Sequence, residues 1–187
     1  MMSKKPTKKP DEARIRGYLY RNLAMRDWAR KMLYQKAVAK FEDAKMINKL
    51  LDEFEEEGML CDARFAEGYI RSARDYRGYG PIKTRMRLME KGVKNSLFED
   101  YLCESHDIWV LRCFEARQKR FGALPDSVDD KSKQFRFLQQ RGFNGTQIKL
   151  AFFDSLPFDV DSIELPEIEN QEAISLEDIV EVTRGVG

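Results

Sequence analysis

Three similar short segments recur along the chain, and this repetition constrains the fold more than any other feature of the sequence. The segments are Gln35–Val38, Glu90–Val93 and Gln140–Phe143, and their small central residues are 55 and 50 residues apart. A leucine stands four residues before each small residue, and a pair of mostly apolar residues follows each segment at a matching distance. A repeat of this length is typical of proteins built from stacked helical units.

Each segment has features of a joint between two helices. Gly92 and Gly142 suit the left-handed conformation that commonly ends a helix. The first segment has Ala37 in place of glycine, so we expect the first joint to close differently. Two pairs after the later joints have the spacing of a capping box that starts the next helix: Ser96 with Glu99, and Asn144 with Gln147.

A further helix is expected before each joint, at residues 12–24, 62–76 and 107–120, with Asp62 as the N-cap of the second. The sequence therefore predicts an all-α fold, a tandem array of three three-helix repeats that is elongated and curved and ends in an acidic C-terminal tail. The predicted boundaries are a basic disordered N-terminus at 1–11, helical repeats at 12–60, 61–105 and 106–156, and the acidic tail at 157–187, with a short helix near 176–182.

The formal net charge of +1 conceals a segregation of charge along the chain. Residues 1–154 hold 32 Lys and Arg against 23 Asp and Glu (+9), whereas residues 155–187 hold one Arg against nine acids (−8). Two interpretations of the tail stay open: a solubilising extension, or a segment that folds over the basic body and competes with an anionic partner. No apolar run approaches the roughly 20 residues of a membrane span, and the start lacks a secretory signal, so we expect a cytoplasmic protein.

The sequence offers little for catalysis or metal binding. Its one histidine, His106, lies between Ser105 and Asp107, and adjacent residues of a helix point in different directions and do not form a triad. The three cysteines include no CxxC pair, which argues against a disulfide framework and a zinc site. We therefore expect no enzyme activity, no catalytic residues, no metal and no cofactor.

The basic stretch at residues 71–94 is the best candidate for a binding surface. Its only acids are Asp75 and Glu90. Such a surface suits phosphates or an acidic protein surface, and a solvated helix exterior is the alternative interpretation. The candidate contact residues of this stretch are Arg71, Arg74, Arg77, Lys83, Arg85, Arg87, Lys91 and Lys94.

Helical spacing divides the end of this stretch into two faces. Lys83, Arg87 and Lys91 are four residues apart and form one basic stripe. The roughly opposite stripe is expected to lie in the core, and its members are Ile82, Met86, Met89 and Val93.

Aromatic side chains lie among the arginines, as in platforms on which the bases of single strands stack. We expect Tyr69 to be structural. The secondary contact candidates are Tyr76, Tyr79, Arg136 and Arg141. The third repeat carries further cations, among them Arg112, Lys119 and Arg120, but four acids dilute that set and weaken its signal.

Several segments, in a fixed order, carry a family resemblance. They are Gly58–Ala66 (GMLCDARFA), Tyr69–Arg74 (YIRSAR), Gly78–Pro81 (GYGP) and Lys91–Val93 (KGV), followed in the third repeat by Phe137-Leu138 and Arg141–Phe143. Together they resemble the RecX family over about residues 12–154. The first repeat departs from the family pattern, since Ala29 and Met32 stand where Ser and Glu are expected, and this puts the capping of that helix in question.

The resemblance implies a chain of three-helix repeats that binds RecA, the bacterial recombinase, when RecA is assembled on single-stranded DNA. Proteins of this family are understood to occupy the groove of that filament and to depress its ATP hydrolysis and strand exchange. The implied partners are the RecA filament and single-stranded DNA, bound directly or through the filament, and we expect a monomer. The family offers no catalytic residues to carry over.

Two other functions fit the residues. A sequence-independent DNA-binding protein of helical repeats would bind DNA without any recombinase. A protein scaffold with no role for nucleic acid would leave the basic stretch solvated, so that its neutralisation would have no effect.

Overall fold

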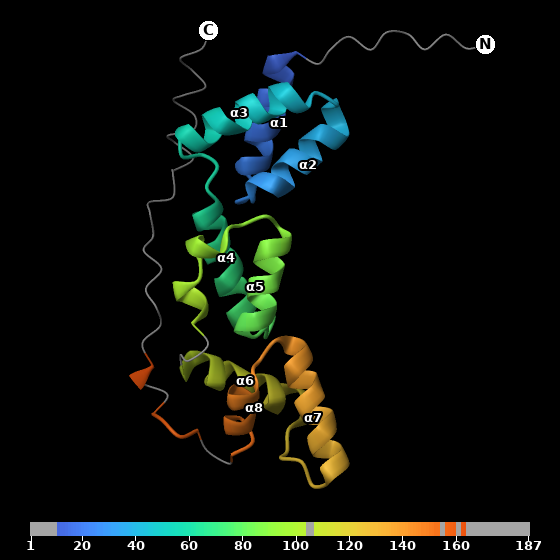
Figure 1. The fold of residues 1–187 in the computed structure, drawn as a ribbon, viewed down its shortest axis with the longest axis vertical. Helices are drawn as coiled ribbons and strands as arrows, with labels where there is room; N and C mark the ends of the chain where they lie inside the picture. The colour runs from blue at the N-terminus through green and yellow to red at the C-terminus, as the bar shows by residue number, and fades with distance from the viewer. Residues whose placement is uncertain (1–10, 104–106, 154–155, 160–161, 164–187) are drawn as a thin grey trace, which may run out of the picture. The chain divides into compact units, whose positions relative to one another are not determined.

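The computed structural model describes residues 11–103, 107–153, 156–159 and 162–163, which contain eight α-helices, two 3-10 helices and no strand (Figure 1). None of the helices described is long and apolar enough to cross a membrane. The elements are α1 (Glu12–Leu23), α2 (Arg30–Phe41), α3 (Ala44–Glu56), α4 (Asp62–Asp75), α5 (Pro81–Glu90), η1 (Asn95–Leu97), η2 (Asp100–Leu102), α6 (Asp107–Phe121), α7 (Val128–Arg141) and α8 (Gly145–Leu150).

The helices form two compact units, an N-terminal unit that extends to Phe65 and a C-terminal unit that begins at Ala66. The all-α prediction is confirmed, and the predicted repeat boundaries stay a prediction. The basic N-terminus to residue 10, His106 and the acidic segment from residue 164, with its expected short helix, lie outside the described residues.

The core of the N-terminal unit lies between α1, α2 and α3. Ile15 and Leu19, which the helical pattern of the first repeat places inward, are fully buried, and so is Leu33 of α2. Leu50 and Phe54 of α3 complete this cluster. Because full burial of each such side chain contributes about 1.5–3 kcal/mol, this apolar cluster is a main source of the stability of the three helices.

The first joint lies later in the chain than the repeated segments predict. Ala37 is inside α2, whose C-cap is Glu42 in the left-handed conformation (φ 56°). Asp43 then caps α3 by accepting a hydrogen bond from the backbone N–H of Met46 (3.1 Å). This joint does close differently, but its placement at Ala37 was wrong, because alanine is a strong helix former and nothing there stops the helix.

The start of α2 has a cap from a distant part of the sequence. Its own N-cap, Ala29, makes no side-chain hydrogen bond. Instead, a carboxylate oxygen of Asp62 accepts a hydrogen bond from the backbone N–H of Arg30 (2.8 Å). Asp62 is the first residue of α4, not its N-cap as predicted, and its carboxylate serves α2. The missing serine at position 29 is thus compensated from α4.

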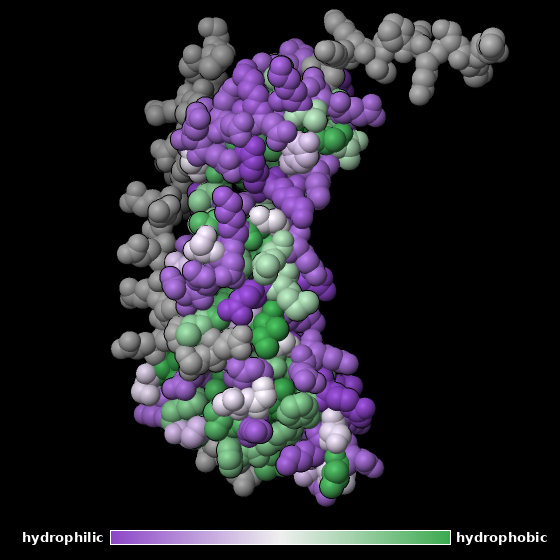
Figure 2. Space-filling model, viewed as in Figure 1, coloured by the Kyte–Doolittle hydropathy of each residue, from purple (hydrophilic) through white to green (hydrophobic). Residues whose placement is uncertain are grey.

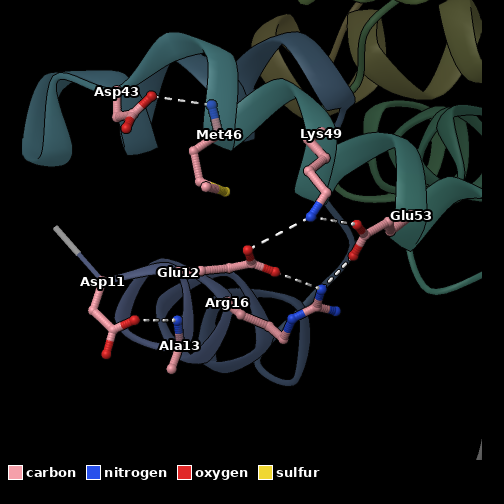
Figure 3. A network of polar contacts seen from close by, with 8 residues as sticks. All are labelled: Asp11, Glu12, Ala13, Arg16, Asp43, Met46, Lys49 and Glu53. Atoms are coloured by element: carbon pink, nitrogen blue, oxygen red, sulfur yellow. Dashed lines mark hydrogen bonds and ion pairs between the residues drawn. The ribbon is translucent and has the colours of Figure 1, made fainter. Parts of the chain in front are cut away.

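An ion-pair network joins α1 to α3 in the N-terminal unit. Figure 3 shows Arg16 and Glu12 of α1 facing Glu53 and Lys49 of α3. Arg16 pairs with Glu53 and with Glu12, and Lys49 lies 3.5 Å from both carboxylates. The hydrogen bond from Arg16 is the main reason that the pKa of Glu53 lies below its ordinary value. The charges are partly exposed, so this network orients the helices more than it stabilises them.

The C-terminal unit closes around α6, α7 and α8. Helix α8 packs against both α6 and α7 (Figure 1). The shared core contains Cys113, Leu138, Phe143 and Ile148. Arg117 is also buried here, and its guanidinium donates to the backbone oxygens of Ala151 (2.8 Å) and Ala123 (3.0 Å), which offsets the cost of burying the group.

The later joints show which glycine and capping signals were informative. Gly92 (φ 89°) and Gly142 (φ 91°) both adopt the predicted left-handed conformation. The predicted capping box at the start of α8 is confirmed: Gln147 N donates to the Asn144 side chain and Asn144 N to the Gln147 side chain (both 2.9 Å). The box predicted at Ser96 was wrong, because the chain forms η1 and η2 there and the Glu99 carboxylate accepts from the Asn95 side chain instead.

Helix α5 buries a different face from the one predicted. Of the expected core stripe only Val93, beyond the end of the helix, is buried. The buried residues of α5 are Pro81, Thr84 and Leu88. Thr84 is accommodated in the core because its hydroxyl donates to the carbonyl oxygen of Gly80 (2.9 Å). The members of the expected stripe that are instead exposed are Ile82 (36%), Met86 (56%) and Met89 (55%).

Two glycines allow the start of α5 to lie directly against the end of α7. Gly80 N donates to Arg141 O (2.8 Å), and Ile82 N donates to Gly142 O (3.1 Å). A Cβ on Gly80 would lie 2.5 Å from the carbonyl carbon of Gly142 and 2.6 Å from the nitrogen of Phe143. These are backbone atoms that cannot rotate aside, so only glycine fits at position 80 although its φ of −80° suits any residue.

Replacing Gly80 with alanine should therefore destabilise the C-terminal unit by about 1–3 kcal/mol, the usual cost of overpacking. Gly68→Ala is the matched control. Gly68 is exposed within α4, a Cβ there would meet nothing within 4 Å, and alanine favours the helix, so this change should stabilise by up to about 1 kcal/mol. Thermal and urea unfolding followed by circular dichroism measure both changes. Equal effects of the two substitutions would contradict the packing constraint at Gly80.

Candidate functional site

A pocket in the C-terminal unit is lined mainly by cations. Its volume is about 420 Å³, and it lies where the end of α4 and the following loop meet α6 and α7. The cations at its wall are Arg74, Arg77, Arg112, Lys119, Arg120 and Arg141. Two acids, Asp75 and Glu115, also line it. We call this cavity the basic pocket.

The glycine contact described above positions two sides of the basic pocket. Since the chain before α5 is hydrogen-bonded to the end of α7, Arg77 and Arg141 are brought together from positions 64 residues apart. A guanidinium nitrogen of Arg141 donates to the carbonyl oxygen of Arg77 (2.7 Å). Gly78, which follows Arg77, has a left-handed backbone (φ 61°) that turns the chain after α4.

Asp75 neutralises part of the charge. Its carboxylate accepts hydrogen bonds from Arg74 (2.8 and 3.1 Å) and pairs with Arg112 (3.2 Å). Partial burial alone would raise the pKa of Asp75, but the hydrogen bond from Arg74 and the charges of Arg74, Arg112 and Arg71 outweigh it and hold that pKa below its ordinary value. Arg112 also pairs with Glu115 (2.8 Å).

Four cations of the basic pocket have no carboxylate within 4.0 Å in the part of the chain that the structure describes: Arg77, Lys119, Arg120 and Arg141. An anion 4 Å from any one of them gains about 1 kcal/mol in water and about 4 kcal/mol at the effective dielectric constant of a protein surface. Guanidinium groups bind phosphate or carboxylate oxygens in pairs. The pocket is therefore suited to an anionic group of a partner.

Aromatic rings accompany these cations. Tyr76 is 84% exposed at the wall of the pocket, where a planar group of a ligand can stack on it. Phe137 also lines the pocket, and the guanidinium of Arg141 lies 5.0 Å from the centre of its ring. This contact holds Arg141 in place without neutralising its charge.

The remaining predicted residues lie outside the lining of the basic pocket. The ammonium of Lys83 lies 4.5 Å from the ring centre of Tyr79 and donates to Gln140 O (3.1 Å). Arg87 pairs with Glu90 (2.8 Å), and Arg85 donates to Leu102 O (3.2 Å). Lys91 and Arg77 flank the half-buried ring of Tyr69 at 5.4 and 5.1 Å. Three others are exposed: Arg71, Lys94 and Arg136.

One prediction needs correction. Arg74 was expected on the surface with Arg71, three residues earlier on the same helix, but Arg74 is only 7% exposed. Its guanidinium is held by Asp75, so Arg74 shapes the wall of the pocket and its charge is already compensated. By contrast, Lys119 and Arg120 are among the cations of the third repeat, which were judged a weaker signal because of nearby acids. In the structure they line the same cavity as Arg77.

No group of three His, Cys, Asp or Glu side chains within the described ranges is placed to hold a metal ion. The pocket also contains no nucleophile beside a base, since its titratable groups are cations, two carboxylates and one tyrosine.

Two stretches of the chain match models of known domains. Residues 62–102 match the second three-helix domain of RecX, and residues 112–152 match the third. The chain is 33% identical over 138 residues to the regulatory protein RecX of Halorhodospira halophila, covering 73% of this chain and 85% of that protein. It is 36% identical over 140 residues to the regulatory protein RecX of Chromohalobacter salexigens, covering 75% of this chain and 91% of that protein.

Solved structures share the fold. A crystal structure of RecX from Lactobacillus salivarius superposes with a TM-score of 0.63 at 19% identity, covering 75% of this chain and 93% of that one. A second crystal structure of a regulatory protein RecX gives a TM-score of 0.66 at 16% identity, covering 75% of this chain and 72% of that one.

The Asp75 cluster gives a test of the geometry of the pocket. Asp75→Asn leaves the buried guanidinium of Arg74 without its counter-ion and should destabilise the fold by about 1–3 kcal/mol, less than for a fully buried pair because Asp75 is partly exposed. The pKa of this carboxyl is lowered in the folded state, so its contribution is present at neutral pH and is lost as the pH falls below about 4. The difference in the free energy of unfolding between the variant and the wild type should therefore become smaller in acid.

The matched control is Asp126→Asn, which removes the same charge from an exposed loop residue and should change stability by less than about 0.5 kcal/mol. Urea unfolding at pH 7 and at pH 3.5 measures both variants. A gap for Asp75→Asn that is absent at pH 7, or constant between the two pH values, would show that the ion pair does not form.

Proposed function

The chain belongs to the RecX family, and on that premise we propose that it is a non-enzymatic regulator that binds the filament of a RecA recombinase on single-stranded DNA and depresses its ATP hydrolysis and strand exchange. Such a filament is found in the cytoplasm, where we place this protein as a monomer acting in recombination and DNA repair. The relatives named above are regulatory proteins, which supports regulation as the general role.

The observation that carries the proposal is the basic pocket, in which four cations have no carboxylate within 4.0 Å among the described residues. A nucleoprotein filament presents phosphates and acidic side chains in a regular array, and a cluster of cations beside an exposed tyrosine matches that chemistry. The pocket holds no catalytic constellation, so its effect on the filament must come from binding. A regulator of this kind acts by favouring one state of the filament over another.

Tandem helical domains suit such a partner for a second reason. When several domains of one chain contact successive parts of a polymer, each later contact forms at high effective concentration, so that modest individual contacts sum to tight binding. The energy is then distributed, and the loss of one contact weakens regulation without abolishing it. The cations outside the pocket, such as Arg71 and Arg136, are candidates for these further contacts.

The main test is a titration of RecA ATP hydrolysis on single-stranded DNA. Wild-type protein should inhibit at ratios well below one molecule per recombinase subunit. Arg77→Glu with Arg120→Glu reverses two charges of the pocket and should raise the concentration for half-inhibition at least tenfold, since a charge-assisted contact contributes about 1.5–3 kcal/mol. Unchanged hydrolysis across a broad range of wild-type concentration would end the proposal.

The matched control reverses two charges of the same unit outside the pocket. Lys131→Glu with Lys133→Glu alters two exposed cations of α7 and changes the net charge by the same amount. It should inhibit almost as well as wild type. If both double variants lose inhibition equally, general electrostatic attraction and not the pocket is responsible.

Binding to DNA alone separates this proposal from a plain DNA-binding function. Fluorescence anisotropy with a labelled single strand, in the absence of recombinase, should show weak binding. The logarithm of the association constant should fall against the logarithm of the salt concentration with a slope of about 0.7 per phosphate contact. The Arg77→Glu, Arg120→Glu variant should lower this slope by the amount that corresponds to one or two phosphate contacts. Tight binding to bare DNA with no effect on recombinase would favour the plain DNA-binding protein.

A further inference from the structure

The outer face of α5 carries an apolar stripe. Ile82, Met86 and Met89 are spaced i, i+4 and i+7, which places them on one side of the helix, and all three are substantially exposed. Figure 2 shows hydrophobic colours on the surface over α5. Among the described residues eight large hydrophobic side chains are exposed, and these three are the only ones that share a helix. We call them the α5 stripe.

The α5 stripe points away from the core of its own domain. At about 100° per residue, its centre lies roughly 130° around the helix from the centre of the buried set Pro81, Thr84 and Leu88. The helix therefore satisfies its own packing with one face and presents a second apolar face outward. Scattered exposed apolar residues are ordinary, but a contiguous set on one helix face marks an interaction site.

Cations border the α5 stripe on both sides. By the same helical geometry, Arg85 lies along one edge and Lys83, beside Glu90, lies along the other, whereas Arg87 lies further round the helix. Glu90 is the one acid of α5, and it pairs with Arg87 (2.8 Å). Methionine side chains are flexible and polarisable and adapt to irregular partner surfaces. The complementary surface is thus an apolar groove with carboxylates at its rim.

We infer that the α5 stripe is a protein-docking surface that packs into an acid-rimmed apolar groove on a recombinase subunit, while the basic pocket takes anionic groups. This inference rests on the proposed function, because it assigns to that partner a second, apolar contact. The two surfaces then have separate roles: the pocket gives a contact that weakens with salt, and the stripe gives one that does not.

A second copy of the same chain is a poorer occupant. Two α5 helices packed face to face would set the cations of one copy close to those of the other, and like charges across an interface are unfavourable. A stripe of three side chains is also small beside the ~800 Å² per partner of a stable dimer interface. An extended partner that is held at other points as well does not need a large contact here.

The test removes the apolar side chains without changing charge. Met86→Ser with Met89→Ser should raise the concentration for half-inhibition of RecA ATP hydrolysis about tenfold or more, and should leave binding to bare single-stranded DNA unchanged. Met86→Leu with Met89→Leu keeps the apolar character and should retain inhibition. Because both positions are exposed, the circular dichroism spectrum and melting temperature of each variant should match those of the wild type.

The matched control is Met25→Ser with Val128→Ser, which removes two apolar side chains that are 85% and 82% exposed and lie outside the stripe. It should inhibit as wild type does. If the wild type inhibits and the Met86→Ser, Met89→Ser variant is equally potent, the inference about the α5 stripe is wrong and the proposed function stands. Wild-type protein that leaves hydrolysis unchanged overturns the proposed function and the inference with it. Sedimentation tests the remaining occupant. If the wild type is a dimer and Met86→Ser with Met89→Ser abolishes the dimer, the stripe binds a second copy and the inference is overturned.

Discussion

The close backbone contact between Gly80 and Gly142 is the constraint on which the arrangement of the C-terminal unit depends. Two peptide hydrogen bonds cross it, and neither residue could carry a side chain there without meeting the other segment. The contact joins the loop before α5 to the end of α7, and so brings Arg77 and Arg141 to one cavity. Peptide groups in such a contact are rigid, so the positions of the cations are fixed by the backbone more than by flexible side chains.

The same contact explains why α5 presents an apolar face outward. Its first turn is held by Gly142 through the backbone N–H of Ile82, and Thr84 and Leu88 are turned into the domain. Rotating α5 to bury the methionines would break those hydrogen bonds and leave peptide groups unpaired, at about 1–3 kcal/mol each. The exposure of Met86 and Met89 is therefore a property of the backbone arrangement, which makes a binding role the simplest reason for apolar side chains there.

Local signals in the sequence predicted only part of the local structure: they failed at Ala37, at Ser96 and for the buried face of α5, and they could not show contacts made by distant residues. The left-handed conformation of Gly92 and Gly142 and the Asn144 capping box were predicted from neighbouring residues, and both are found as expected. The cap of α2 comes from Asp62, 32 residues away, and no pattern around Ala29 reveals it. The face of α5 was misassigned because hydrophobicity alone ranks methionine above threonine, whereas the structure gives Thr84 a carbonyl acceptor. The basic pocket likewise brings Arg77 together with Lys119 and Arg120, which are more than 40 residues away in the sequence.

Glu42 shows why a left-handed helix end and a required glycine are separate matters. Glu42 ends α2 at φ 56° with an exposed side chain, so the chain tolerates a backbone cost of about 1–2 kcal/mol there. Gly142 ends α7 in a similar conformation, but a Cβ at this position would also lie 2.9 Å from the Cα of Lys83. A left-handed backbone admits residues other than glycine at a modest cost, whereas the lack of space for a Cβ at position 142 does not. The glycine in the third repeated segment is thus explained less by the end of its own helix than by the helix that packs against it.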